Sequence, residues 1–479
     1  MLFATLKRAV QRHAPFHPIR RAAVLAPLMS AVLLAACGGG GDDALEPGAT
    51  CSVVDQNLWL QSVMREEYFW YAYSANPDPT RFSSPDDYFA ASLYAGGDPQ
   101  FPADRWSYVS STADYNRFFV DGANLGYGVL VAALEVSGLP DAPLRVRYVE
   151  PGSPAALAGL ARGDQLLSVN GQPASALISA GNYSALSADA AGQLLTLSVR
   201  NASGDRSLTL TSASYPLAPV TRVSVLNSPG GRKLGYVMIK DMVSQARSPI
   251  DAAFADFRAA GVQEAVIDLR YNGGGLVSVA ADIASYPAAQ RTAGQTFANL
   301  LYNDKQQSRN QRFGFTNWAN SLALTRVYVL TGPRTCSASE QVINGLRPFV
   351  DVVTIGDTTC GKPVGFEARD GGCGSVWSAV NFESANALNE GRYFDGFAAT
   401  CPVADDLSQP LGSATDPLVA AAALHADTGA CPAVAVSSAG SQRQSLMRRA
   451  ASAAGSSGVT STPRLRPLEP GEGRGMLGR

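Results

Sequence analysis

The stretch Ala265-Val266-Ile267-Asp268-Leu269-Arg270-Tyr271-Asn272-Gly273-Gly274-Gly275 decides the fold of this 479-residue chain. Its first six residues predict a buried strand, and the glycines predict a loop where that strand ends. The same reasoning predicts strands at 234–239, 326–331 and 352–356, and helices at 249–260, 277–286 and 339–346. Because strands and helices alternate, residues 216–432 are predicted to form an α/β (α+β) core in which helices cover a sheet.

Two further loops follow predicted strands of this core. Cys336-Ser337-Ala338 comes after strand 326–331, and Cys360-Gly361-Lys362 comes after strand 352–356. Functional sites form at strand ends in sheets covered by helices. We therefore expect these two loops and the glycine loop to form one site.

Ser337 and Lys362 indicate nucleophilic catalysis without histidine. The chain has three histidines, and His425 is the only one beyond residue 17. Burial lowers the pKa of a lysine, whereas arginine does not deprotonate in proteins. Lys362 is one of only five lysines among 38 basic residues, and we predict that it is the general base for Ser337.

Each of these residues also has a plain structural interpretation. A serine among small residues can cap a helix, a lysine can be solvated, and glycines can form a simple turn. The 25-residue spacing of Ser337 and Lys362 and the glycine loop together favour a catalytic site. Asp268 and Arg270 are expected to hold loops together by an ion pair or hydrogen bonds and to take no part in the chemistry. The chain has neither a G-x-S-x-G nor an S-x-x-K motif, which disfavours hydrolases of those types.

Residues 120–215 contain short β-like runs and three segments that resemble a PDZ domain. The segments are Gly126-Tyr127-Gly128-Val129, Val149-Glu150-Pro151-Gly152-Ser153-Pro154-Ala155 and the run from Gly163 to Gly171. In a PDZ domain the first segment is the carboxylate-binding loop. The resemblance implies that amides around Tyr127, Gly128 and Val129 bind the C-terminus of a peptide that adds a strand to the sheet edge.

From this block to about residue 430 the chain resembles the carboxyl-terminal processing, or tail-specific, proteases. The matching segments are Asp268 to Gly275, Ser337-Ala338-Ser339-Glu340 and Gly356 to Lys362. The resemblance implies a ClpP/crotonase-like core, Ser337 as nucleophile, Lys362 as general base, and the amides of Gly275 and Ala338 as oxyanion donors. Phe366 stands where the family often has a glutamine, so we expect another group, Glu340, to orient the lysine.

The N-terminal sequence predicts export and lipid anchoring. Basic residues precede an apolar run, and Leu34-Ala35-Ala36-Cys37 resembles a bacterial lipobox in which Cys37 carries the lipid. Gly38 after the cysteine implies sorting to the outer membrane, facing the periplasm. A plain signal peptide or a membrane anchor is the alternative. Six further cysteines favour disulfides, of unassigned pairing, over a metal site.

These patterns divide the chain into six parts. They are a signal peptide (1–36), a lipidated tether (37–52), an N-terminal helical region (53–118), a PDZ-like domain (119–215), a protease core (216–432) and a disordered tail (433–479). The aromatic cluster at Tyr68-Phe69-Trp70 is expected to be core or an interdomain contact. Ser84-Pro85-Asp86-Asp87 predicts a helix start.

The predicted function is that of an exported serine endopeptidase that captures protein C-termini. The alternatives are an inactive PDZ-bearing lipoprotein adaptor or ligand-binding protein on the same fold, and an esterase or amidase with the same dyad. We expect no cofactor and no metal ion, and the net charge of −2 gives no basis for nucleic-acid binding. The substrate and the oligomeric state are left open.

Overall fold

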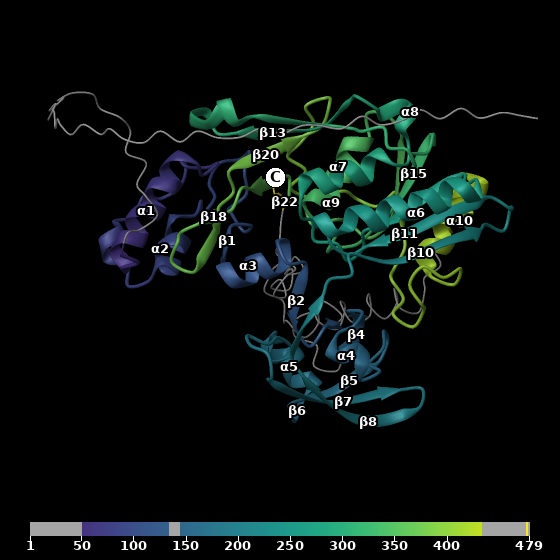
Figure 1. Ribbon diagram of the computed structural model, residues 1–479, viewed down its shortest axis with the longest axis horizontal. Helices are drawn as coiled ribbons and strands as arrows, with labels where there is room; N and C mark the ends of the chain where they lie inside the picture. Colours follow the sequence, from purple (N-terminus) through teal and green to yellow (C-terminus); the bar gives the residue numbers. More distant parts are fainter. Residues whose placement is uncertain (1–49, 134–143, 434–475, 478–479) are drawn as a thin grey trace, which may run out of the picture. The chain divides into compact units, whose positions relative to one another are not determined.

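The computed structural model describes residues 50–133, 144–433 and 476–477. The predicted signal peptide, Cys37, most of the tether and most of the C-terminal tail lie outside the described residues. What is described is a mixed α/β protein with an N-terminal module, a PDZ-like block and a larger core (Figure 1). No helix in the described ranges has both the length and the apolar character that crossing a bilayer requires.

The core is built on one six-stranded sheet with the order β10-β11-β12-β15-β16-β21. The strands β11 to β21 run parallel, and β10 pairs antiparallel with β11. Their bounds are β10 (Val220–Asn227), β11 (Lys233–Ile239), β12 (Glu264–Asp268), β15 (Arg326–Thr331), β16 (Asp351–Gly356) and β21 (Cys401–Pro402). Parallel strands end at the same edge of a sheet, so the loops after β12, β15 and β16 meet there.

Helices cover both faces of this sheet, as predicted. One face, with Val237, Ile267 and Val329, packs in a single apolar cluster with helices α6 (Arg247–Ala260), α7 (Val277–Ser285) and α9 (Ala338–Leu346). The opposite face, with Val266 and Tyr328, packs against α10 (Pro417–Thr428). Because successive strand residues point to opposite faces, a strand buried on both sides is almost entirely apolar, as at 265–267.

A second sheet with the order β14-β13-β20-β17-β22 flanks the core. Its strands are β13 (Thr296–Tyr302), β14 (Gln311–Gly314), β17 (Val364–Phe366), β20 (Phe382–Ala385) and β22 (Met476–Leu477), and the short helix α8 (Ala289–Thr292) precedes it. The strand β22 pairs parallel with β17, Gly365 opposite Met476. The prediction of a wholly disordered tail is therefore wrong at 476–477, where backbone pairing to β17 gives the segment a strand.

The N-terminal module is only partly helical, so the prediction of a helical region over 53–118 needs correction. It comprises α1 (Val53–Glu66), η1 (Pro79–Arg81), α2 (Pro85–Ser92), β1 (Tyr108–Ser111) and α3 (Thr112–Phe119). Ser84 caps α2 as predicted, accepting from the Asp87 amide at 3.1 Å. Phe69 lies beyond α1 because its amide donates to Val380 of the core at 2.7 Å.

This module is attached to the core at three levels. The strand β1 pairs antiparallel with β19 (Ser375–Ser378), which also pairs with β18 (Arg369–Asp370). A disulfide joins Cys51 to Cys373. The aromatic cluster around Trp70 shares an apolar cluster with Val364 and Phe366 of β17, which confirms its prediction as core and interdomain contact.

The PDZ-like block forms an antiparallel sheet with the order β3-β4-β5-β7-β8, and β2 pairs with β9. Its elements are β2 (Ala123–Gly126), β3 (Val129–Ala133), β4 (Leu144–Val149), α4 (Pro154–Leu157), β5 (Gln165–Val169), β6 (Gln172–Pro173), α5 (Ala174–Ala180), η2 (Ser184–Leu186), β7 (Leu194–Asn201), β8 (Gly204–Thr211) and β9 (Ala213–Pro216). The strands β7 and β8 form a hairpin that turns at Ala202-Ser203, because β7 ends at Asn201 and β8 begins at Gly204.

A buried charge cluster joins this block to the core. The Arg270 guanidinium pairs with Asp268 at 2.8 Å, with Asp416 at 2.7 Å and with Asp405 at 2.9 Å, which confirms the predicted Asp268–Arg270 pair. Asp405 also forms an ion pair with Arg162 of the PDZ-like block, at 2.7 Å. One carboxylate therefore serves arginines from two parts of the chain, and Arg270, 2% exposed, anchors the end of β12.

Replacing Arg270 by methionine is expected to lower the free energy of unfolding by about 3–5 kcal/mol. The reason is that Asp268 and Asp416 would be left buried beside each other without their cation. Urea denaturation measures the change. The matched control is Arg200→Met, which removes an exposed pair with Asp205 and is expected to change stability little. Equal effects of the two substitutions would contradict this role of Arg270.

Candidate active site

Ser337 stands between the end of β15 and the start of α9, in an unusual backbone conformation. Its φ is +62°, in the left-handed region that residues with side chains rarely adopt. The preceding loop is held to the end of β12, because the Thr335 hydroxyl donates to the Leu269 carbonyl at 2.8 Å and the Cys336 amide donates to the Asn272 carbonyl at 3.2 Å. Strained residues of this kind cluster at functional sites, where the surrounding structure imposes them.

The side chain of Asn272 fixes the glycine loop. Its amide group donates to the Ile239 carbonyl at 3.0 Å, and its oxygen accepts from the Gly274 amide at 2.8 Å and the Ser339 hydroxyl at 2.9 Å. Asn272 thereby ties β11, the glycine loop and α9 together. Gly274 must be glycine here, since its φ is +107° and a Cβ would lie 3.1 Å from the Ala338 nitrogen.

Two backbone amides remain available beside Ser337. In the described part of the chain, neither the Gly275 amide nor the Ala338 amide donates to another protein group. Ala338 is the first residue of α9, whose N-terminal amides carry partial positive charge. The loop containing Gly275 passes close to Met242, with a Cβ at Gly275 only 2.3 Å from the Met242 carbonyl oxygen. The Ala338 amide, at the positive end of α9, suits an anion.

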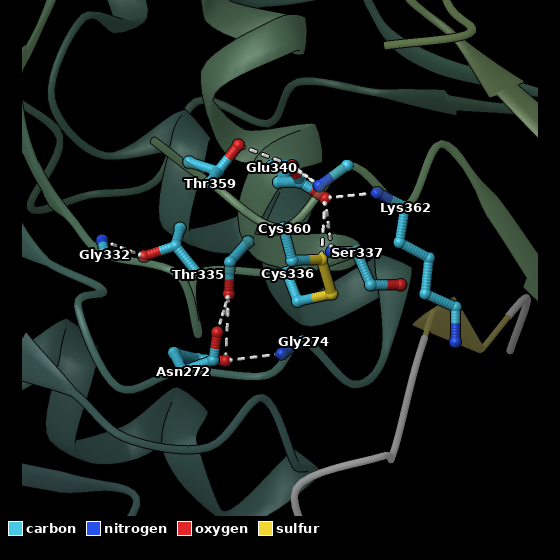
Figure 2. Close-up of a disulfide and its surroundings, with 12 residues drawn as sticks. Asn272, Gly274, Gly332, Thr335, Cys336, Ser337, Glu340, Thr359, Cys360 and Lys362 are labelled. Atoms are coloured by element: carbon cyan, nitrogen blue, oxygen red, sulfur yellow. Dashed lines mark hydrogen bonds between the residues drawn. A yellow bond between two sulfur atoms is a disulfide. The ribbon is translucent and has the colours of Figure 1, made fainter. Parts of the chain in front are cut away.

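Glu340 lies buried at the centre of the site and accepts hydrogen bonds from the Ser337 loop and the Lys362 loop (Figure 2). Its carboxylate accepts from the amides of Ser337 at 2.9 Å, Gly361 at 2.8 Å and Lys362 at 2.8 Å, and from the Thr359 hydroxyl at 2.5 Å. Burial raises the pKa of Glu340, and these four donors oppose that rise. Since the contact with Lys362 is to its backbone amide, Glu340 orients the lysine loop and not the ammonium group, unlike our expectation.

Lys362 is buried, and its pKa lies near neutral pH. Its side chain is in the same region as that of Ser337, on one side of the Cys336–Cys360 disulfide in the view of Figure 2. Burial lowers the pKa of Lys362 to about 7, although Asp104 and Glu340 act in the opposite direction. Its Nζ lies 4.6 Å from the ring centroid of Phe366. A neutral amine at moderate pH is the property that a general base needs.

The N-terminal module supplies part of this environment. Phe366, fully buried below the lysine, packs edge-on against Tyr108 of β1 at 5.4 Å between ring centroids. Asp104 is held nearby in the module by the hydroxyls of Tyr68 at 2.7 Å and Ser107 at 2.6 Å. Sequence reasoning missed Asp104, because no motif connects it with the distant lysine. It singled out Phe366 as a departure from the family pattern but missed its packing against Tyr108.

The six cysteines that lie in the described residues form three disulfides. They are Cys51–Cys373, Cys336–Cys360 and Cys401–Cys431. The prediction of disulfides is confirmed, and the pairing left open is settled. The second bond directly joins the loop of Ser337 to the loop of Lys362 (Figure 2).

The predicted peptide-binding residues Tyr127, Gly128 and Val129 line a cavity of about 90 Å³. Tyr183, Leu186 and Tyr215 also line it, and Lys240 and Asp241 reach it from the end of β11. Gly128 has a φ of +75°, and a Cβ there would lie 2.1 Å from that of Ser153. A side chain at Gly128 would therefore clash inside the protein itself, whether or not a peptide is bound.

His425 belongs to a different part of the core. It lies on α10, and its Nδ1 is 3.1 Å from the Tyr328 hydroxyl. Burial lowers the pKa of His425. The residue packs against the sheet face opposite to α9, in agreement with the expectation that it has no part in the Ser337 site.

Comparison with known proteins identifies three segments of the chain. Residues 233–386 match peptidase family S41, residues 55–108 match the peptidase S41 N-terminal domain, and residues 145–201 match a PDZ domain. The mixed α/β architecture is therefore that of an S41 protease core preceded by its N-terminal domain and a PDZ domain.

Named relatives agree with these matches. The chain is 27% identical over 239 residues to a carboxyl-terminal-processing protease of Picosynechococcus, covering 49% of this chain and 55% of the relative. It is 30% identical over 222 residues to the chloroplastic C-terminal processing peptidase of Tetradesmus obliquus, covering 44% and 46%. The chain thus spans about half the length of these relatives.

A solved Bacteroides fragilis structure that is assigned to the S41 proteases superposes with a TM-score of 0.61 at 28% identity. The superposition covers 78% of this chain and 97% of that one. Sequence and fold together support membership of the C-terminal-processing S41 peptidases that carry a PDZ domain, a serine-type peptidase family.

Replacing Lys362 by methionine is expected to stabilise the protein at pH 7, by an amount that shrinks as pH rises. The folded pKa, about 7, lies below the 10.5 of an unperturbed lysine, so the unfolded chain binds the proton more tightly. Wild-type stability therefore rises with pH between these values. At about 1.4 kcal/mol per pKa unit, the gain from Lys362→Met at pH 7 is on the order of 4 kcal/mol.

Urea denaturation of both proteins at about pH 7 and about pH 10 measures this effect. The expected signature is a stability difference that is large at the lower pH and small at the higher one. A difference that does not change between the two pH values would show that ionisation of Lys362 is not its cause.

Proposed function

We propose that this chain, supported as a member of the C-terminal-processing S41 peptidases with a PDZ domain, is a serine endopeptidase with a Ser337–Lys362 dyad. The observation that carries the proposal is the convergence of two loops on Glu340, which brings together a strained serine and a lysine with a pKa of about 7. A ClpP/crotonase-like core, expected from the family resemblance, is part of the same proposal.

The proposed reaction begins with neutral Lys362. Its amine takes the proton of the Ser337 hydroxyl as the serine oxygen attacks the scissile carbonyl carbon. The lysine ammonium then returns this proton to the leaving amine as the peptide C–N bond breaks, leaving an ester on Ser337. Lys362 next deprotonates a water molecule, which hydrolyses the ester and restores the free serine.

The amides of Gly275 and Ala338 are the proposed oxyanion donors. Neither amide has another protein acceptor in the described residues, and the Ala338 amide directly follows Ser337 at the positive end of α9. A negative charge that develops on the carbonyl oxygen would be stabilised by two preoriented dipoles. Losing one such donor costs about 10²–10³-fold in kcat in serine hydrolases.

The PDZ-like block is the proposed capture site for protein C-termini. Its cavity is lined by the glycine-containing turn 126–128, and β3 begins beside it with an edge to which an extended peptide can add. The substrates would be proteins or peptides with a free terminal carboxylate. Lys240, which also lines the cavity, adds positive charge near such a group, although Glu150 and Asp241 each pair with it at 3.6 Å.

Export and lipid anchoring through Cys37 remain proposals that rest on the N-terminal sequence. Three disulfides fit an oxidising compartment such as the periplasm. A lipidated Cys37 would hold the protein on the outer membrane, facing the periplasm. Detergent phase partitioning of the exported protein tests this proposal, and a wild-type protein that stays in the aqueous phase would exclude the lipid.

Ser337→Ala and Lys362→Ala are each expected to abolish proteolysis while the protein stays folded. General-base catalysis alone contributes about 10²–10⁴-fold to the rate. Because the two residues act as one unit, the double variant should be about as inactive as either single variant. Cleavage of an unfolded protein with an apolar C-terminus is the measurement. Because the neutral amine is the working form, the wild-type rate should also rise with pH through about 7.

His425→Ala serves as the control, since His425 contacts Tyr328 and not the dyad loops. It should keep near wild-type turnover. Near-full activity of Lys362→Ala at neutral pH would exclude the dyad. A wild-type protein that binds C-terminal peptides without cleaving them would instead support the inactive adaptor.

Amidation of a substrate's C-terminus is expected to weaken both its binding and its cleavage. The amide lacks the charge that converging N–H donors bind, and each charge-assisted hydrogen bond contributes roughly 1.5–3 kcal/mol. Binding is measured on the Ser337→Ala protein with the free acid and the amide of one peptide. A short reporter peptide that reaches the dyad unaided is the control and should be cleaved equally in both forms. Equal binding of acid and amide would mean that the PDZ-like block does not recognise chain ends.

A further inference from the structure

The Cys336–Cys360 disulfide lies within the catalytic loops themselves. Cys336 directly precedes the nucleophile Ser337, and Cys360 lies two positions before Lys362. The bond therefore connects the two halves of the proposed dyad by the shortest covalent route that the chain contains (Figure 2). Both cysteine residues are half-buried and not fully enclosed by the protein.

Other contacts hold the two loops together less directly. The Cys360 amide donates to the Thr335 carbonyl at 3.0 Å, and the Glu340 carboxylate accepts from both loops. These hydrogen bonds would keep the loops in the same neighbourhood after the disulfide is broken. They would not fix the distance between Ser337 and Lys362 as strictly as a covalent bond, because each hydrogen bond tolerates variation in length and angle.

Proton transfer within the dyad is sensitive to that distance. A displacement of about 1 Å between reacting groups can cost about 10²-fold in rate. The lysine loop comes from the end of β16 and the serine loop from the end of β15, so the two can shift relative to each other without unfolding either strand. A bond between the loops removes this freedom.

We propose that the Cys336–Cys360 disulfide is a positioning element of the dyad, and that the protease is fully active only when this bond is formed. The inference rests on the proposed Ser–Lys function. A dithiol reductant would break the Sγ–Sγ bond by giving up two electrons and two protons, becoming a disulfide itself and leaving thiols on Cys336 and Cys360. Air oxidation or a disulfide oxidant reverses the step. Reduction would therefore lower the activity without removing any catalytic group.

The chain contains a matched control for this proposal. Cys401–Cys431 spans 30 residues, against 24 for Cys336–Cys360. Since the stabilisation from loop closure depends only on the logarithm of the span, the two bonds are expected to stabilise the fold similarly. Cys401 lies on β21, which pairs with β16 at Ile355, and Cys431 follows α10, so neither cysteine belongs to the dyad loops.

The experiment compares the wild type, Cys336→Ala/Cys360→Ala and Cys401→Ala/Cys431→Ala. Each is assayed on one reporter peptide for kcat, KM and the pH dependence of kcat, and its melting temperature is recorded by circular dichroism. A chelator is present in every assay, because the donor atoms of Cys336, Cys360 and Glu340 lie within 4.8 Å of one another and would otherwise offer reduced protein a metal site.

The expected result is a fall in kcat of about 10²-fold for Cys336→Ala/Cys360→Ala, with KM little changed and a displaced pH midpoint. Cys401→Ala/Cys431→Ala should keep the wild-type kcat and pH midpoint despite a comparable loss of melting temperature. Unchanged kcat in the first variant, or equal losses in both, would overturn the positioning role.

A second measurement tests the proposal even if Cys336→Ala/Cys360→Ala does not fold. The wild type is reduced in steps, its free thiols are mapped by alkylation and mass spectrometry, and it is then reoxidised. Activity should fall when Cys336–Cys360 is reduced and return when the bond reforms. Activity that stays the same when this bond is broken would refute the inference. An inactive wild type that matches Ser337→Ala would instead refute the proposed function, and the inference with it.

Discussion

One buried carboxylate organises the site. Glu340 accepts from the amides of both loops that carry the proposed catalytic residues, and from a hydroxyl between them. A buried carboxylate is costly unless each lone pair finds a donor. In the conformation that satisfies Glu340, Ser337 has a left-handed backbone and the Lys362 amide donates to the same carboxylate. The hydrogen bonds that a buried carboxylate requires therefore fix the conformation of both loops.

The character of Lys362 depends on parts of the chain that are remote in sequence. The core positions the residue, but the wall that excludes water from its amine includes Phe366 and, packed against it, Tyr108 of the N-terminal module. Burial lowers the pKa of the lysine, and the carboxylates of Asp104 and Glu340 limit the fall. A base that works near neutrality results from this balance between desolvation and nearby negative charge.

Much of the core could be predicted from the sequence because its signals are local. The strand at 326–331 was predicted to the residue, since a continuous apolar run in a doubly covered sheet has few alternatives. The N-terminal region was harder: apolar spacing continued past Glu66, yet the helix ends there because Phe69 pairs with Val380 of the core. The loops of Ser337 and Lys362 were found from their spacing, whereas the backbone contacts of Glu340, the influence of Asp104 and the disulfide pairing arise only from tertiary packing.

The shared carboxylate of Asp405 has a practical consequence for dissecting the molecule. Arg162 donates not only to Asp405 but also to the Tyr271 hydroxyl at 2.6 Å and to the Arg147 carbonyl at 2.8 Å. Removing residues 119–215 would expose the Tyr271 ring and more of the Asp405 carboxylate, which contact Arg162 in the intact protein. Such a shortened chain would fail for reasons unrelated to peptide capture, so the contribution of the PDZ-like block is better studied by point substitution in the intact protein.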